Sequence, residues 1–154
     1  MDNSELISTL NNLIETSKDG EAGFRTCAED ISDDRLKALF ATRSQECAKA
    51  ALELQEQVRS LGGDPEKSTS ISADMHRRWI DIKAAVVGKD DVSILNECER
   101  GEDVAKKSYR NALEKDLPAS IRAIVERQNA GVLRNHDQVK ALRDQARETK
   151  EIAG

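Results

Sequence analysis

The feature that most constrains this sequence is an apolar repeat at intervals of three and four residues, interrupted and restarted along the chain. Leu6, Leu10 and Leu13 open the first run, and similar runs follow. This spacing forms one stripe on an α-helix, whereas a half-buried strand would alternate. The pattern therefore predicts five amphipathic helices, over residues 4–31, 34–61, 71–87, 91–116 and 119–144.

Short breaks separate the predicted helices. Ser32-Asp33-Asp34 supplies a new N-cap, and Gly62-Gly63-Asp64-Pro65 stops the second helix because Pro cannot continue it. Gly88-Lys89-Asp90 and Leu117-Pro118 end the third and fourth helices. Two tight antiparallel hairpins joined by a long connection that contains a helix form the ferritin-like topology. The charged tail, residues 145–154, has no apolar stripe and is predicted to fray.

Composition supports an all-α chain folded as a single domain over residues 1–154. The 154 residues are 38% hydrophobic but only 3% aromatic, and this aliphatic balance favours helices over a β-sandwich. A chain of this length buries enough surface for one core. The predicted fold class is thus all-α, a ferritin-like four-helix bundle of two antiparallel hairpins with an additional crossover helix.

Charge and hydropathy exclude several classes of partner. The formal net charge is -5 and no basic run is present, which disfavours nucleic-acid binding and the compaction of DNA. No apolar stretch approaches the roughly 20 residues that span a bilayer, so no membrane contact is expected. The acidic start of the chain does not resemble a signal peptide, and a cytoplasmic location is predicted.

The three cysteines are predicted to be reduced core residues. Cys27, Cys47 and Cys98 lie far apart in the sequence, each on an apolar stripe. They lack the C-x-x-C spacing of a zinc or redox site, and unpaired cysteine on an apolar face behaves as a small hydrophobic residue.

Four strings in the sequence resemble one family. They are Leu61-Gly62-Gly63, Met75-His76-Arg77-Arg78-Trp79, Glu99-Arg100-Gly101-Glu102-Asp103, and the run from His136 to Asp144. The resemblance is to a bacterial family of ferritin-like bundles catalogued as a domain of unknown function, and it covers nearly the whole chain. The resemblance supports the fold but indicates little about function, because proteins of one fold can carry different functional sites.

More distantly, the chain resembles di-iron carboxylate bundles of the rubrerythrin and ferritin type. Such bundles take a Glu from each of two helices and a Glu-x-x-His from each of the other two. In this sequence Lys49 follows Glu46 where the ligand His would stand, and Asn129 follows Glu126 in the same way. Without these imidazoles, the di-metal site is predicted to be degenerate.

Polar residues interrupt the apolar stripes. They are Arg43, Glu102, Gln128 and Asn135 on the stripes, with Glu21 and His136 at the edges. At about 1.5 Å per residue, all but Gln128 are expected about 16 to 18 Å from the end where the first two helices meet. Burying polar groups without partners is costly, so these side chains are predicted to form one structural polar layer.

Two interpretations of this layer are open. In the first, Arg43 bridges Glu102 and Glu21 in a buried ion-pair network that fixes helix pairing. In the second, one iron, manganese or zinc ion is bound by Glu21, Glu46, Glu102 and His136, with Glu99 as a spare ligand. Arg43 argues against the second interpretation, because a guanidinium neutralises the carboxylates that a cation needs.

Aromatic residues offer two further candidates. His76 and Trp79 are three residues apart and share one face of the predicted crossover helix. Either they form a ligand-binding surface, or Trp79 anchors the helix to the bundle beside a solvated His76, which is the favoured alternative. Tyr109 is predicted to be a core residue with a hydrogen-bonded hydroxyl.

Function is the least constrained property. No Ser/His/Asp arrangement or glycine-rich phosphate loop is visible, so no catalytic residue and no bound cofactor are expected. The sequence favours a non-catalytic stress-related or interaction protein with a degenerate di-metal site. It is predicted to be a monomer or dimer that acts through a protein partner or self-association. The alternative is a ferritin-like metalloprotein that oxidises or stores iron, or handles peroxide.

Overall fold

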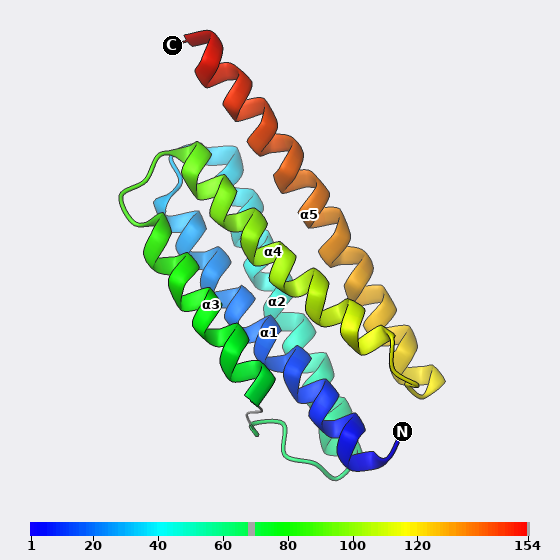
Figure 1. Cartoon of the computed structure of the whole chain (residues 1–154). Helices are drawn as coiled ribbons and strands as arrows, with labels where there is room; N and C mark the ends of the chain where they lie inside the picture. The colour runs from blue at the N-terminus through cyan, green and yellow to red at the C-terminus, as the bar shows by residue number, and fades with distance from the viewer. Residues whose placement is uncertain (68–69, 154) are drawn as a thin grey trace.

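The computed structural model describes residues 1–67 and 70–153, without the side chains of residues 70–72, 74, 75 and 153. This part of the chain forms five helices: α1 (Asn3–Asp30), α2 (Asp34–Ser60), α3 (Ser70–Val86), α4 (Asp91–Leu113) and α5 (Ala119–Ala153). The α1–α2 and α4–α5 pairs form hairpins, and α3 packs against α1 and α4 as the crossover helix (Figure 1). No described helix combines the length and apolarity needed to cross a membrane.

Aspartate side chains cap helix starts and glycines follow helix ends. Asp2, Asp33 and Asp90 accept hydrogen bonds from first-turn N–H groups of α1, α2 and α4, which have no partner inside the helix. Gly62 and Gly88 have φ of 80° and 72°, the left-handed region that glycine adopts at little cost. These positions explain why the predicted breaks end the helices.

The end of α5 differs from the prediction. The helix continues to Ala153 instead of ending near residue 144 with a frayed tail. Its last turns are tied to the start of α4 by polar contacts, from Arg147 to Asn96 at 2.8 Å and from Lys150 to Asp90 at 2.7 Å. The prediction was wrong because ion pairs and hydrogen bonds, which need no apolar stripe, hold this segment.

The end of α4 comes earlier than residue 116. The helix stops at Leu113, and Arg122 of α5 donates to two carbonyls there, those of Leu113 at 3.2 Å and Lys115 at 2.5 Å. A cationic donor at a helix C-terminus satisfies carbonyls that have no partner in the helix. The side chain of Arg122 thus lets the chain turn before the proline.

The core consists of two apolar clusters. The cluster nearer the α1–α2 turn includes Phe24, Phe40 and Trp79, and the other includes Leu10 and Leu54. Burial of each such side chain contributes roughly 1.5–3 kcal/mol to folding. All three cysteines are free and buried, as predicted.

Trp79 anchors the crossover helix between α1 and α4. Its indole is 1% exposed and contacts Phe24 edge-to-face, with 5.3 Å between ring centroids. A Cβ at Gly23 would lie 2.1 Å from Trp79 Cζ3, and one at Gly101 would lie 2.2 Å from Cη2. Both glycines therefore make room for the indole. Because Trp79 is buried, it forms no surface with His76, and the predicted anchoring role of Trp79 is confirmed.

Candidate functional site

The centre of the bundle holds a buried ion pair between α2 and α4. Arg43 donates to both oxygens of Glu102, from Nε to Oε1 at 2.7 Å and from Nη2 to Oε2 at 3.3 Å. Glu102 is 0% exposed and Arg43 is also buried. Burial raises the pKa of Glu102, and the charge of Arg43 opposes that rise. The guanidinium also lies over the Phe24 ring, 5.6 Å from its centroid.

Gln128 and Asn135 make separate contacts. Tyr109 donates its hydroxyl proton to Gln128 Oε1 at 2.7 Å, and the Gln128 amide donates to Glu53 at 2.8 Å. Asn135 donates to Glu46 Oε2 at 3.3 Å, and Arg43 Nη1 approaches the same oxygen at 3.6 Å. Glu46 thus links Asn135 to the ion pair, whereas Gln128 belongs to a second polar group with the buried Tyr109.

Glu21 does not join this arrangement. Its carboxylate pairs with Arg25 one turn along α1 at 2.8 Å, and its side chain is one-third exposed. Its backbone carbonyl accepts from Ser44 of α2 at 2.7 Å. The predicted ligand set of Glu21, Glu46, Glu102 and His136 is therefore not gathered around one point.

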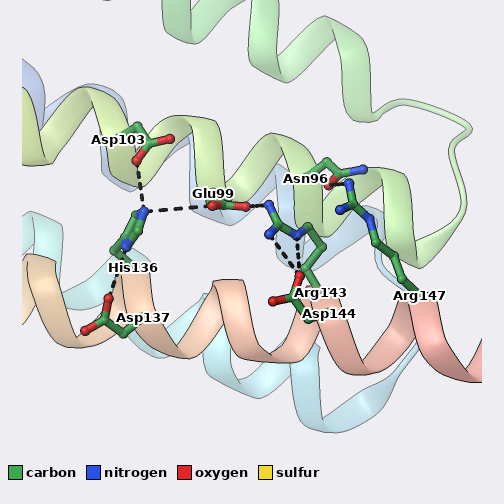
Figure 2. A network of polar contacts seen from close by, with 8 residues as sticks. All are labelled: Asn96, Glu99, Asp103, His136, Asp137, Arg143, Asp144 and Arg147. Carbon is green, nitrogen blue, oxygen red and sulfur yellow. Dashed lines mark hydrogen bonds and ion pairs between the residues drawn. The ribbon is translucent and has the colours of Figure 1, made fainter.

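A different cluster forms on the α4–α5 face. Glu99 and Asp103 lie one turn apart on α4, and His136 reaches them from α5 (Figure 2). His136 Nε2 is 2.9 Å from Asp103 Oδ1 and 3.9 Å from Glu99 Oε1. One ligand atom from each residue lies within 4.8 Å of the other two. We call these three residues the α4–α5 cluster.

Neighbouring residues fix the cluster's geometry. His136 Nδ1 is 3.2 Å from Asp137 Oδ1, which orients the ring so that Nε2 faces α4. Arg143 contacts one carboxylate oxygen of Glu99, Oε2, so that the other oxygen, Oε1, faces His136 (Figure 2). The Asp103 side chain is 57% exposed, so the cluster opens to solvent.

Sequence reasoning identified Glu99 and His136 as candidates but not Asp103. The signal for Asp103 was its position four residues after Glu99, which puts both carboxylates on one helix face. Asp103 lies off the apolar stripe, where most carboxylates are simply solvated.

The second histidine lies in a different pair. His76 of α3 is within 2.6 Å of the buried Asp19 of α1, measured from Nδ1 to Oδ1. Burial raises the pKa of Asp19, and His76 opposes the rise. The His76 side chain is 51% exposed. This pair joins α3 to α1 and shares no residue with the α4–α5 cluster.

Comparison of the sequence with known families gives a match over residues 5–115, to the family described as Domain of unknown function (DUF2383). The chain belongs to this family. This match confirms the resemblance for the three strings between Leu61 and Asp103, whereas the fourth, from His136 to Asp144, lies outside the matched residues. No curated protein matches the DUF2383 chain at a significant level.

Solved structures confirm the ferritin-like fold of the DUF2383 chain. A dodecameric thioferritin, the bacterioferritin-related protein from Bacteroides fragilis, aligns with a TM-score of 0.79 at 17% identity, covering 98% of this chain and 92% of that one. A ferritin-like diiron-carboxylate protein from Bacillus anthracis aligns with a TM-score of 0.68 at 18% identity, covering 92% and 99%. At these identities the likeness establishes the fold alone.

The centre of the DUF2383 bundle does not fit two metal ions. A di-iron site needs inward-facing carboxylates and two Glu-x-x-His motifs with free donor atoms. Here both oxygens of Glu102 accept from Arg43, and neither Glu46-Cys47-Ala48-Lys49 nor Glu126-Arg127-Gln128-Asn129 ends in the His of that motif. A guanidinium at this place also repels a cation. No step through a di-iron centre follows from these residues.

The α4–α5 cluster does fit one divalent ion. It offers two carboxylate oxygens and one imidazole nitrogen, a donor set suited to zinc, iron or manganese. The contact of His136 with Asp137 is an outer contact of the kind that orients a ligand. Arg143 pairs with Oε2 of Glu99 and leaves Oε1, whereas Arg43 occupies both oxygens of Glu102. Without an ion, His136 Nε2 contacts the two carboxylates directly, at 2.9 Å from Asp103 Oδ1 and 3.9 Å from Glu99 Oε1.

Proposed function

We propose that this chain is a non-catalytic ferritin-like protein that acts through contacts with protein chains, and that a buried ion pair replaces its di-metal centre. The observation that carries the proposal is the two-point contact of Arg43 with the fully buried Glu102. A charge-assisted pair of this kind occupies the carboxylate and fixes how α2 and α4 pack. The stress-related role and the cytoplasmic location predicted from the sequence are part of this proposal.

Iron oxidation kinetics test the proposal. Fe(II) is mixed with metal-free protein in aerated buffer, and ferric absorbance is followed by stopped flow. We expect the rate to equal that of Fe(II) in buffer alone, and to be the same for Glu102→Gln. Oxidation that is faster with protein, lost in Glu102→Gln and retained in the matched control Glu21→Gln would contradict the proposal.

Self-association is supported by one comparison, since the Bacteroides fragilis relative is dodecameric. The monomer or dimer predicted from the sequence rests on the charged outer faces of the helices. Light scattering after size exclusion distinguishes these assemblies, with 17.0 kDa or twice that mass expected. A mass of twelve chains would refute the smaller assembly.

A second candidate function is the binding of one divalent metal ion by the α4–α5 cluster, and the convergence of its three ligand atoms favours it. Iron is the ion that the ferritin-like fold suggests, with manganese and zinc as alternatives that accept the same donors. The cluster lies on one face of the bundle and not at its centre. It would therefore hold an ion without making the bundle a di-iron oxidase.

Equilibrium dialysis against each metal ion, followed by elemental analysis, tests this candidate. We expect one ion per chain, lost in His136→Ala and in the double variant Glu99→Gln/Asp103→Asn. His76→Ala is the matched control, because His76 also faces a carboxylate but belongs to no such cluster. Binding unchanged in His136→Ala, or none in the parent chain, would dispose of this candidate.

A further inference from the structure

A cleft of about 460 Å³ is lined mainly by residues of α2 and α5. These two helices belong to different hairpins (Figure 1). Residues of α1 and α4, including Ser17 and Tyr109, also line it. The volume is within the range of small-molecule sites, which in helical bundles lie between helices. The cleft shares no residue with the α4–α5 cluster, so a ligand here would be independent of a metal there.

Gly131 of α5 keeps this cleft open. A glycine inside a helix costs about 1 kcal/mol relative to alanine, so a structural reason for it is expected. At Gly23 and Gly101 that reason is Trp79, but a Cβ at Gly131 would meet only the end of the Arg134 side chain, at 3.6 Å. Packing therefore does not require a glycine at position 131, and its effect is to leave space in the cleft.

The lining of the cleft is positively charged in an acidic protein. Its charged residues are the cations Arg43, Lys49, Arg127 and Arg134 and the carboxylates Glu46 and Glu53, four positive charges against two negative. The whole chain has a net charge of -5, so the lining of the cleft has the opposite charge to the protein as a whole. Such a concave cationic surface attracts anions.

Two of these cations are available to a ligand. Arg43 is held by Glu102, and Arg127 contacts Glu53. Of the carboxylates that the structure describes, none lies within ion-pair distance of Lys49 or Arg134, and both side chains are at the exposed edge of the cleft. The lining also includes the apolar Ala50 and Val132.

We infer that the α2–α5 cleft binds a small molecule with one carboxylate or phosphate group and a short apolar body. Lys49 and Arg134 hold the anionic group, and the apolar body lies along Ala50 and Val132 in the space left by Gly131. A guanidinium and an ammonium are the groups that proteins use for such anions. A metal cation does not fit this site, because the charges that line it repel one.

Amide chemical shifts measured by NMR test the inference with octanoate, octyl phosphate and octylammonium as probes. We expect one or both anions to give saturable shifts confined to residues of the cleft, and octylammonium to give none. The first two probes separate a carboxylate ligand from a phosphate ligand. Shifts scattered over the surface, equal binding of octylammonium, or no binding of either anion would overturn the inference.

Variants of the cleft complete the test. Lys49→Gln/Arg134→Gln should weaken anion binding at least about tenfold, because charge-assisted hydrogen bonds are lost. Lys89→Gln/Lys140→Gln is the matched control, which lowers the net charge equally at exposed lysines outside the cleft. Gly131→Leu should abolish binding by filling the space, with an unchanged circular dichroism spectrum. Equal affinity in the parent and the Lys49/Arg134 variant would refute the role of these two cations.

Discussion

Arg43→Met is the substitution with the clearest expected consequence. Methionine keeps most of the apolar stem of Arg43 but removes every donor to Glu102, which is 0% exposed and loses partners at both oxygens. Breaking a buried pair by removing one partner costs about 3–5 kcal/mol, because the remaining charge is uncompensated. Domains of this size unfold with about 5–15 kcal/mol, so urea denaturation followed by circular dichroism should resolve the loss.

The stability lost in Arg43→Met should depend on pH, and the pKa of Glu102 determines the direction of this dependence. Burial already raises the pKa of Glu102, and removing Arg43, which opposes the rise, raises it further. A carboxyl group whose pKa is raised by folding adds stability at low pH that is lost as the pH rises through that pKa. The deficit of Arg43→Met relative to the parent should therefore shrink as the pH falls from 7 toward the ordinary glutamate pKa of about 4.3.

Two variants make this prediction falsifiable. Arg25→Met removes the exposed pair with Glu21 and should cost under about 0.5 kcal/mol. Arg43→Met/Glu102→Leu removes both charges, and should recover most of the stability lost in Arg43→Met. The reasoning fails if Arg43→Met costs no more than Arg25→Met, or if its deficit is the same at pH 7 and pH 5.

Three other outcomes follow from single contacts. Gly101→Ala should destabilise the protein by about 1–3 kcal/mol in urea, because the new Cβ would lie 2.2 Å from the Trp79 indole. Burial raises the pKa of Tyr109 to about 12, so absorbance of this single tyrosine should show ionisation near that value, and stability should fall as the pH rises from about 10. Lys150 and the N-terminal backbone of α4 hold the pKa of Asp90 below its ordinary value, and Lys150→Gln should raise it in an NMR titration.

The fold could be predicted from the sequence because local signals determine it. The apolar repeat indicates where the helices lie. The chain turns at the glycines 62 and 88 and at the aspartates 33 and 90. The true end of α5 could not be predicted, because it depends on contacts of Arg147 with Asn96 of α4 and of Lys150 with Asp90, the N-cap of α4, about 50 to 60 positions away. An apolar stripe indicates apolar packing and carries no signal for polar contacts of this kind.

The sequence predicted how far along the bundle the residues of the candidate site lie, but not the directions in which their side chains point. Rise per residue gives the height of a side chain along the bundle, and it placed Arg43 and Glu102 at one level, where they form an ion pair. It does not give the direction in which a side chain points. Glu21 has the expected height but turns toward Arg25, and His136 turns toward Asp103 and not toward Glu102.

The central claim is that an ion pair occupies the place of the di-metal centre. Anomalous diffraction at the iron edge, from crystals grown in metal-free buffer and soaked anaerobically in Fe(II), tests it most directly. We predict no anomalous peak within coordination distance of Glu102, and an Arg43 guanidinium that stays within hydrogen-bond distance of both carboxylate oxygens. One or two iron peaks bound to Glu102, with Arg43 displaced from it, would contradict the account.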